Sequence, residues 1–152
     1  MNPLLLPSAG APTPQSRIIL AQVSTPSAGL DWSYTVPNHY ALEVTNIHAR
    51  FLASATVATR SLRILFTSAG NNVTQAVQTS QPTASQDLRQ FYGQGVGVSS
   101  TITIAGIVYN VLALPRCVLQ SGANIQSLTD SIQVGDQWSS IVVQGIAYPL
   151  GS

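Results

Sequence analysis

The segment WSSIVVQGIAY at residues 138–148 has the strongest strand pattern in the chain. Successive side chains of a strand point to opposite faces of a sheet, so residues of equal parity share a face. The apolar residues of the two faces are Ile141, Val143 and Ala147 on one, and Val142, Ile146 and Tyr148 on the other. A strand with one face in water normally alternates apolar and polar residues. This segment is therefore predicted to be covered on both faces, and a neighbouring subunit could supply part of the cover.

Other strand patterns precede this segment, and turn residues separate them. They lie at residues 17–23, 31–36, 40–53, 60–67, 73–79, 85–92, 98–114 and 123–129. Within 40–53 the apolar residues change parity, which predicts a β-bulge near Thr45 and Asn46. Gly106 is expected to break or bend the segment 98–114. Residues 85–92 fit a strand or one helical turn, and a strand is favoured.

These segments give about eight short strands, and no stretch has sustained helical periodicity, so the fold class is predicted to be all-β. The expected architecture is an antiparallel two-sheet sandwich of the jelly-roll type. An immunoglobulin-like sandwich is the alternative, because it also consists of short strands at close spacing. Residues 17–152 are expected to form this domain.

Residues 1–16 differ in composition from the rest of the chain. They contain four prolines, at Pro3, Pro7, Pro12 and Pro14. Proline has no backbone N–H and favours extended backbone, so an extended Pro-rich N-terminal arm is predicted here. Leu4, Leu5 and Leu6 are too apolar for a purely solvating tail, and we expect them to dock on a partner. A disordered tail without such a role is the alternative.

Charged residues make up only 7% of the 152 residues, against about 25% in typical soluble domains. The chain has no lysine, and its net charge is +1. Lysine commonly protects exposed strand edges from pairing with other chains. We therefore expect sister chains or a partner to cover much of the exterior, the alternative being a monomer with a neutral, hydroxyl-rich surface. No clustered basic patch indicates a nucleic-acid partner.

Three further features concern where the chain folds. A membrane-spanning helix needs about 20 consecutive apolar residues, and every apolar run here is much shorter. The first residues lack the basic and apolar regions of a signal peptide. Cys117 is the only cysteine, so no internal disulfide forms. These features predict folding in a cytoplasm and no membrane partner.

Few side chains could carry out catalysis. His39 and His48 are the only histidines, and no Gly-x-Ser-x-Gly elbow is present. Cys117 is interpreted as a small buried residue rather than a nucleophile. The chain is therefore predicted not to be an enzyme. A small hydrolase, with one histidine close to an acid and a serine, is the alternative.

No cofactor or metal site is predicted either. The aspartates that could bind calcium are Asp31, Asp130 and Asp136, and they lack the spacing of a calcium loop. The glycine-rich segment 93–97 precedes a strand pattern rather than the helix that a phosphate site requires. This segment is interpreted as a connection between strands.

The aromatic residues Trp32, Tyr34, Tyr92 and Trp138 allow two interpretations. Such residues are usually anchors of a core or an interface, and a cluster exposed in one groove would instead bind a sugar. The predicted partner-binding residues are Leu4, Leu5 and Leu6 of the arm, together with Trp138 and Tyr148 of the last strand pattern.

Three segments, DWSYTVP at 31–37, RSLRI at 60–64 and VGDQWSSIVV at 134–143, resemble small jelly-roll structural proteins of tailed bacteriophages. That group includes head decoration (cement) proteins and some tail and fibre domains. The resemblance implies a homotrimer that is made in the host cytoplasm and binds the major capsid protein on the exterior of the virion. The alternative is a tail, baseplate or fibre protein that adsorbs to a host glycan.

Overall fold

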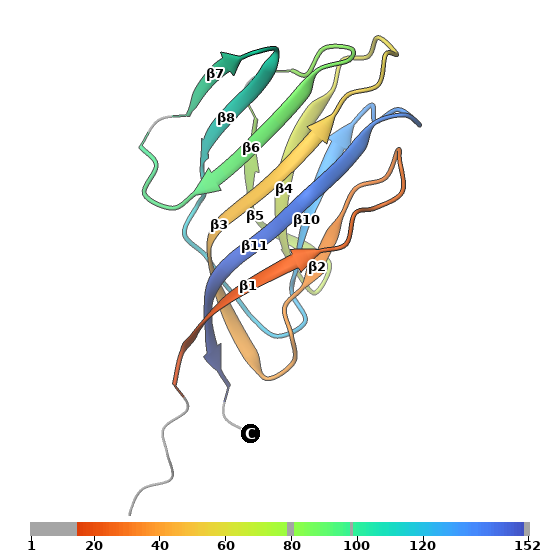
Figure 1. Cartoon of the computed structure of the whole chain (residues 1–152). Helices are drawn as coiled ribbons and strands as arrows, with labels where there is room; N and C mark the ends of the chain where they lie inside the picture. Colours follow the sequence, from red (N-terminus) through yellow and green to blue (C-terminus); the bar gives the residue numbers. More distant parts are fainter. Residues whose placement is uncertain (1–14, 79–80, 98, 151–152) are drawn as a thin grey trace, which may run out of the picture.

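The computed structural model describes residues 15–78, 81–97 and 99–150, which form strands, turns and loops (Figure 1). The all-β prediction is confirmed, and this part of the chain offers no helix that could span a membrane. The strands are β1 (Arg17–Val23), β2 (Ser33–Thr35), β3 (Tyr40–Leu52), β4 (Ser61–Ser68), β5 (Asn71–Val77), β6 (Asp87–Gly93), β7 (Ser100–Ile104), β8 (Ile107–Ala113), β9 (Val118–Leu119), β10 (Asn124–Asp130) and β11 (Gln137–Pro149).

The strands form two sheets, as predicted. The larger sheet has the order β1-β11-β3-β6-β8-β7, with the short β9 paired to β3, and the smaller has the order β2-β10-β4-β5. Four of the pairings are nested in sequence: β1 with β11, β2 with β10, β3 with β6, and β4 with β5. The chain passes from one sheet to the other after β1, β2, β3, β5, β9 and β10, so neither sheet is formed by one continuous part of the sequence.

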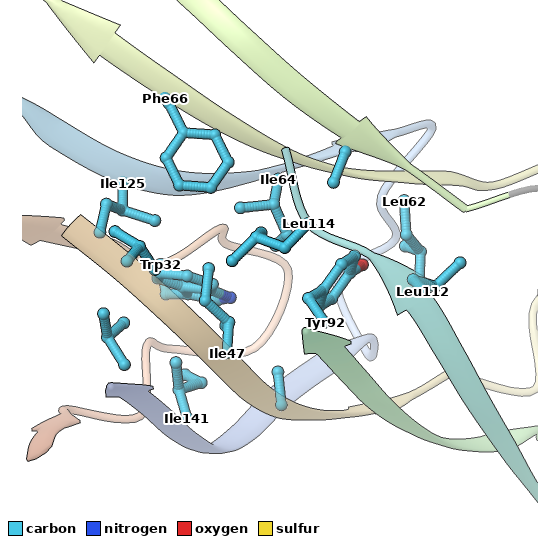
Figure 2. Close-up of a cluster of buried hydrophobic side chains, with 14 of the residues drawn as sticks. Trp32, Ile47, Leu62, Ile64, Phe66, Tyr92, Leu112, Leu114, Ile125 and Ile141 are labelled. Atoms are coloured by element: carbon cyan, nitrogen blue, oxygen red, sulfur yellow. The ribbon is translucent and has the colours of Figure 1, made fainter. Parts of the chain in front are cut away.

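Alternate residues of both sheets meet in one apolar core (Figure 2). Leu62, Ile64 and Phe66 on β4 are fully buried, and Ile47 on β3 and Ile141 on β11 enter the same cluster from the other sheet. Burial of apolar surface stabilises a fold by about 25 cal/mol per Å². Since successive side chains of a strand point to opposite faces, the residues between these core positions point outward.

The predicted bulge in β3 is confirmed. Thr45 has no partner in the β3–β11 register, which continues from Val44 opposite Gly145 to Asn46 opposite Gln144. Leu42 and Val44 before the bulge are buried, and so are Ile47 and the inward residues after it. The apolar residues are even-numbered before Thr45 and odd-numbered after it. Because the bulge adds one residue, both sets point into the core.

The predicted antiparallel pairing is found in every pair of strands except one, because β6 and β8 run parallel. The bend predicted at Gly106 is a tight turn, with φ +49° at Ala105 and +81° at Gly106, and it joins β7 and β8 into a hairpin. This hairpin packs with β8 next to β6, because β8 has buried residues, Val108 and Leu112, whereas every residue of β7 is exposed. The strand with the apolar inward face therefore takes the inner position.

The remaining strand patterns agree with the structure to within two residues at most ends, and residues 85–92 contain a strand rather than a helical turn. The two-residue β9 was not predicted, because it is too short to show a pattern. Of the predicted arm, only Gln15 and Ser16 are among the described residues.

Candidate interaction surface

Among the described residues, the first strand, β1, is an open edge of the larger sheet. It pairs with β11 on one side and ends the strand order on the other. Ile18 and Leu20 point to the outer face and are 76% and 72% exposed, whereas Ile19 packs against the core. An edge strand leaves backbone N–H and C=O groups unpaired, so it can pair with another chain. The β1 edge, Arg17–Val23, therefore offers hydrogen-bonding groups and apolar side chains together.

The outer face of β11 continues this surface. Ile146 lies opposite Ile18 in the register, and Gln144 lies opposite Leu20. The inward residues of β11 are buried, but Ile146 is only half-buried and Tyr148 is 37% exposed. Cover was expected on both faces of this strand. The described residues bury the inner face and cover the outer face only in part.

Tyr148 is held in place by a charged cluster. Its hydroxyl donates a hydrogen bond to Glu43 Oε2 at 3.0 Å, and Arg116 Nε donates one to Glu43 Oε1 at 2.8 Å. These bonds, first that of Tyr148 and then that of Arg116, lower the pKa of the Glu43 carboxyl. Burial, followed by the Glu43 charge, raises the pKa of the neighbouring Cys117 thiol. A raised pKa disfavours the thiolate, so this cysteine is poorly suited to act as a nucleophile.

A groove lies on the outer face of the same sheet, over β3, β6 and β8. Its volume is about 440 Å³, and its lining includes His48, Arg89, Phe91, Tyr109 and Val111. A smaller hollow of about 160 Å³ adjoins it, shares His48 and Arg89, and is lined further by Arg50 and Ser140.

Side chains of the groove and of the adjoining hollow make ring and ion contacts. The His48 and Phe91 rings meet edge to face with centroids 4.5 Å apart, and burial lowers the pKa of His48. Arg50 binds Asp87 through two hydrogen bonds, of 3.0 and 2.9 Å. These hydrogen bonds from Arg50 make the largest contribution to lowering the pKa of the Asp87 carboxyl. The groove thus combines aromatic surface with the Arg89 guanidinium, and the adjoining hollow adds that of Arg50.

The predicted partner-binding residues have different outcomes. Leu4, Leu5 and Leu6 lie outside the described residues. Tyr148 is on the surface, as described above. Trp138 is fully buried between the sheets. Its ring meets the Phe51 ring edge to face, with centroids 4.9 Å apart, and its Nε1 donates a hydrogen bond to Thr129 Oγ1 at 3.1 Å. Its side chain offers no surface to a partner in this fold, because the two sheets enclose it.

The four aromatic residues that would bind a sugar if they were exposed in one groove are not exposed together. Trp32 and Tyr92 are buried, with 2% and 0% of their surface exposed, and Tyr34 is half-buried. Figure 2 shows Trp32 and Tyr92 inside the apolar cluster. These aromatic residues therefore serve the core.

The histidines are not assembled into a catalytic dyad within the described residues. His39 is exposed in a turn, with φ +67°, and its carbonyl accepts a hydrogen bond from Leu150 N at 2.7 Å. His48 lies in the groove, where no hydrogen bond joins its ring to an acid or hydroxyl of the described chain. A nucleophile and base normally lie within hydrogen-bonding distance of each other.

The three candidate calcium ligands have separate partners. Asp31 Oδ1 accepts a hydrogen bond from Ser127 Oγ at 2.7 Å, and Asp130 and Asp136 pair with arginines. The described residues contain no group of three or more His, Cys, Asp or Glu that could hold a metal.

The groove residues Arg89 and Tyr109 were missed by sequence reasoning. Alternation places each on an outer face, but their proximity depends on the parallel β6–β8 pairing, which puts Tyr109 opposite Arg89. A scan against family models, a search of curated proteins and a search of solved structures each found no match to this chain. Its function is therefore inferred from its own residues and geometry.

Proposed function

We propose that the chain is a non-enzymatic structural protein that works in a homo-oligomeric assembly, and that this assembly is part of a virus particle. The observation that carries the proposal is the β1 edge, with Ile18 at 76% and Leu20 at 72% exposure. Burying one such side chain stabilises a complex by about 1.5–3 kcal/mol before the cost of ordering is subtracted. Two adjacent exposed aliphatic residues on an open edge therefore favour association.

The β1 edge also lacks the usual protection against pairing. Charged residues and prolines commonly protect exposed edges. The only charged residue of β1 is Arg17, and its guanidinium lies over the Tyr40 ring, 4.5 Å from the centroid. The opposite edge, β7, has no charged residue, and its Ile102 and Ile104 are 57% and 59% exposed. Both ends of the sheet are therefore open to other chains.

We further propose that the sandwich is of the jelly-roll type. The nested pairings, with the first strand beside the last, are those expected when a long antiparallel hairpin is wound into two sheets. In this proposal the β7–β8 hairpin is an addition beyond β6. A jelly roll agrees with the resemblance to phage structural proteins, and with a head decoration protein that forms homotrimers and binds the major capsid protein on the capsid exterior. A tail, baseplate or fibre location is the alternative.

Replacing Ile18 and Leu20 together with serine is expected to convert the oligomer into a 16.0 kDa monomer. Both side chains are exposed in the single chain, so the fold loses little apolar packing while the interface loses two anchors. Light scattering coupled to gel filtration at micromolar concentration measures the change.

The matched control for this experiment replaces Val57 and Val134, which are 90% and 88% exposed and lie outside the strands, with serine. This variant should remain oligomeric, because the substituted residues lie away from the edge. Monomeric wild-type protein, or a double serine variant at the β1 edge that still forms the oligomer, would contradict the proposed role of this edge.

Attachment to the particle is expected to depend only weakly on ionic strength. Salt screens exposed charges, and most of the proposed contact is apolar. The measurement is the amount of protein retained on purified particles from low to high salt, together with its location in the particle by electron microscopy. Loss of most of the bound protein at high salt would show that the arginines dominate the contact.

A further inference from the structure

The charges of the described side chains balance almost completely. Four arginines are paired with four acids: Arg50 with Asp87, Arg60 with Asp136, Arg63 with Asp130, and Arg116 with Glu43. Arg17 lies over the Tyr40 ring. The nearest carboxylate to Arg89 is Asp87 Oδ1, 3.6 Å from its Nε, and Asp87 already accepts two hydrogen bonds from Arg50. Arg89 therefore has no carboxylate of its own.

Arg89 also occupies an unfavourable position. It lies directly opposite Arg50 in the β3–β6 register, and like charges at directly opposed positions destabilise a sheet. Its Nε is buried without a hydrogen-bond partner, although the side chain as a whole is 41% exposed. An unsatisfied buried donor carries a cost of about 1–3 kcal/mol. The like-charge cost would fall if an anion bound the exposed part of the Arg89 guanidinium.

The groove beside Arg89 has a volume of about 440 Å³ and an aromatic lining, which suit a small organic ligand. Tyr109 lies opposite Arg89 on the parallel neighbouring strand and is 40% exposed. Phe91 and His48 form the next part of the lining. Small-molecule sites typically combine apolar and aromatic lining with a few polar groups that fix orientation.

We propose that this groove binds a sugar that carries a single carboxylate, such as a hexuronic acid. Two guanidiniums and one carboxylate, from Arg50, Arg89 and Asp87, leave one positive charge uncompensated, which matches a monoanion. A planar carboxylate can accept two parallel hydrogen bonds from the fork of Arg89. The apolar C–H face of the sugar ring then packs on the electron-rich rings of Tyr109 and Phe91. This site goes beyond the assembly role, because it uses none of the β1 edge residues.

The test is to titrate the full chain with glucuronic acid, with glucose and with acetate. NMR and calorimetry measure the binding of each of these three probes. Glucuronic acid should bind at least tenfold more tightly than either of the others, because only it offers both the carboxylate and the sugar ring. Arg89→Gln should weaken glucuronic acid binding at least tenfold, and Tyr109→Ala should also weaken it. Arg63→Gln, which removes an arginine from the other sheet, should leave it unchanged.

Thermal unfolding separates loss of binding from loss of fold. Arg89→Gln removes the charge opposite Arg50, so the variant should be at least as stable as the wild type without ligand. Glucuronic acid should raise the melting temperature of the wild type but not that of the variant. Equal binding of glucose and glucuronic acid, acetate binding as tight as that of glucuronic acid, or unchanged binding by Arg89→Gln would each overturn the proposal. The Ile18 and Leu20 serine variant should bind glucuronic acid normally, so failure of the assembly proposal and failure of this one are distinguishable.

Discussion

Gly145→Ala is expected to destabilise the chain by about 3 kcal/mol or more, near or beyond the upper end of overpacking effects. Gly145 lies opposite Val44 at the bulge of β3, in the strand between β1 and β3. A Cβ added here would lie 2.7 Å from Leu42 Cδ1 and even closer to the Glu43 carbonyl oxygen. The backbone oxygen cannot rotate away as a flexible side chain could, so the strands themselves must separate.

The measurement for Gly145→Ala is urea and thermal unfolding. A loss of about 3 kcal/mol corresponds to a fall in melting temperature of roughly 6–12 °C for a chain of this size. The control is Gly97→Ala, where the added Cβ would meet no atom of the described residues within 4 Å and φ is not positive. This control should have almost wild-type stability. A Gly145→Ala protein as stable as the control would show that β3 and β11 are not packed as described.

Much of the fold could be predicted because the periodicity of single strands is local information. The change of apolar parity inside β3 was sufficient to predict the bulge at Thr45, and Gly106 was sufficient to predict the bend between β7 and β8. The lateral order of strands depends instead on which hairpin packs more apolar surface inward. The parallel β6–β8 pair follows from the buried Val108 and Leu112, a property of the assembled core rather than of either segment.

The candidate sites were less predictable for the same reason. Trp138 and Tyr148 have the same parity, so alternation alone would place them on one face of β11. The register shift between Ser139 and Val142 reverses the faces, so the first is buried and the second lies on the surface. The groove requires Arg89, Tyr109 and His48 from three strands, and their proximity depends on the strand order. Ile18 and Leu20 were visible as apolar residues, but their exposure depends on β1 being an edge.

The buried pair of Arg60 and Asp136 provides the second large effect on stability. Neither side chain has exposed surface. Arg60 Nε donates to Asp136 Oδ2 at 2.7 Å, and its Nη2 donates to Oδ1 at 2.9 Å and to the Thr56 carbonyl at 2.9 Å. The amides of Ser54 and Gln133 also donate to Asp136, each at 2.8 Å. The pair therefore joins the loop after β3 to the turn before β11.

Arg60→Met is expected to cost about 3–5 kcal/mol, because it leaves a buried carboxylate without its cation while keeping similar side-chain volume. The matched control is Arg63→Met at the partly exposed pair with Asp130, where the loss should be about 0–1 kcal/mol. Asp136→Asn and the double variant complete a mutant cycle. The double variant should not recover full stability, because the asparagine amide replaces one of the oxygens that accept hydrogen bonds from Ser54 and Gln133.

The dependence of stability on pH gives an independent measure of this pair. Burial alone would raise the pKa of Asp136, but the hydrogen bonds from Arg60, Ser54 and Gln133 outweigh it and hold the pKa below the ordinary value of 3.8. A carboxyl whose pKa is lowered by folding contributes stability that is present above the unfolded pKa and lost as the pH falls through the folded pKa. In Arg60→Met the Asp136 carboxylate lacks its cation, so burial should raise its pKa. Protonation then removes the unpaired buried charge and with it most of the destabilisation. The difference in unfolding free energy between wild type and Arg60→Met should therefore be largest near neutral pH. It should shrink as the pH falls from the raised pKa of the variant towards the lowered pKa of the wild type. A difference that stays constant from pH 7 to pH 3 would show that the loss comes from packing rather than from the ion pair.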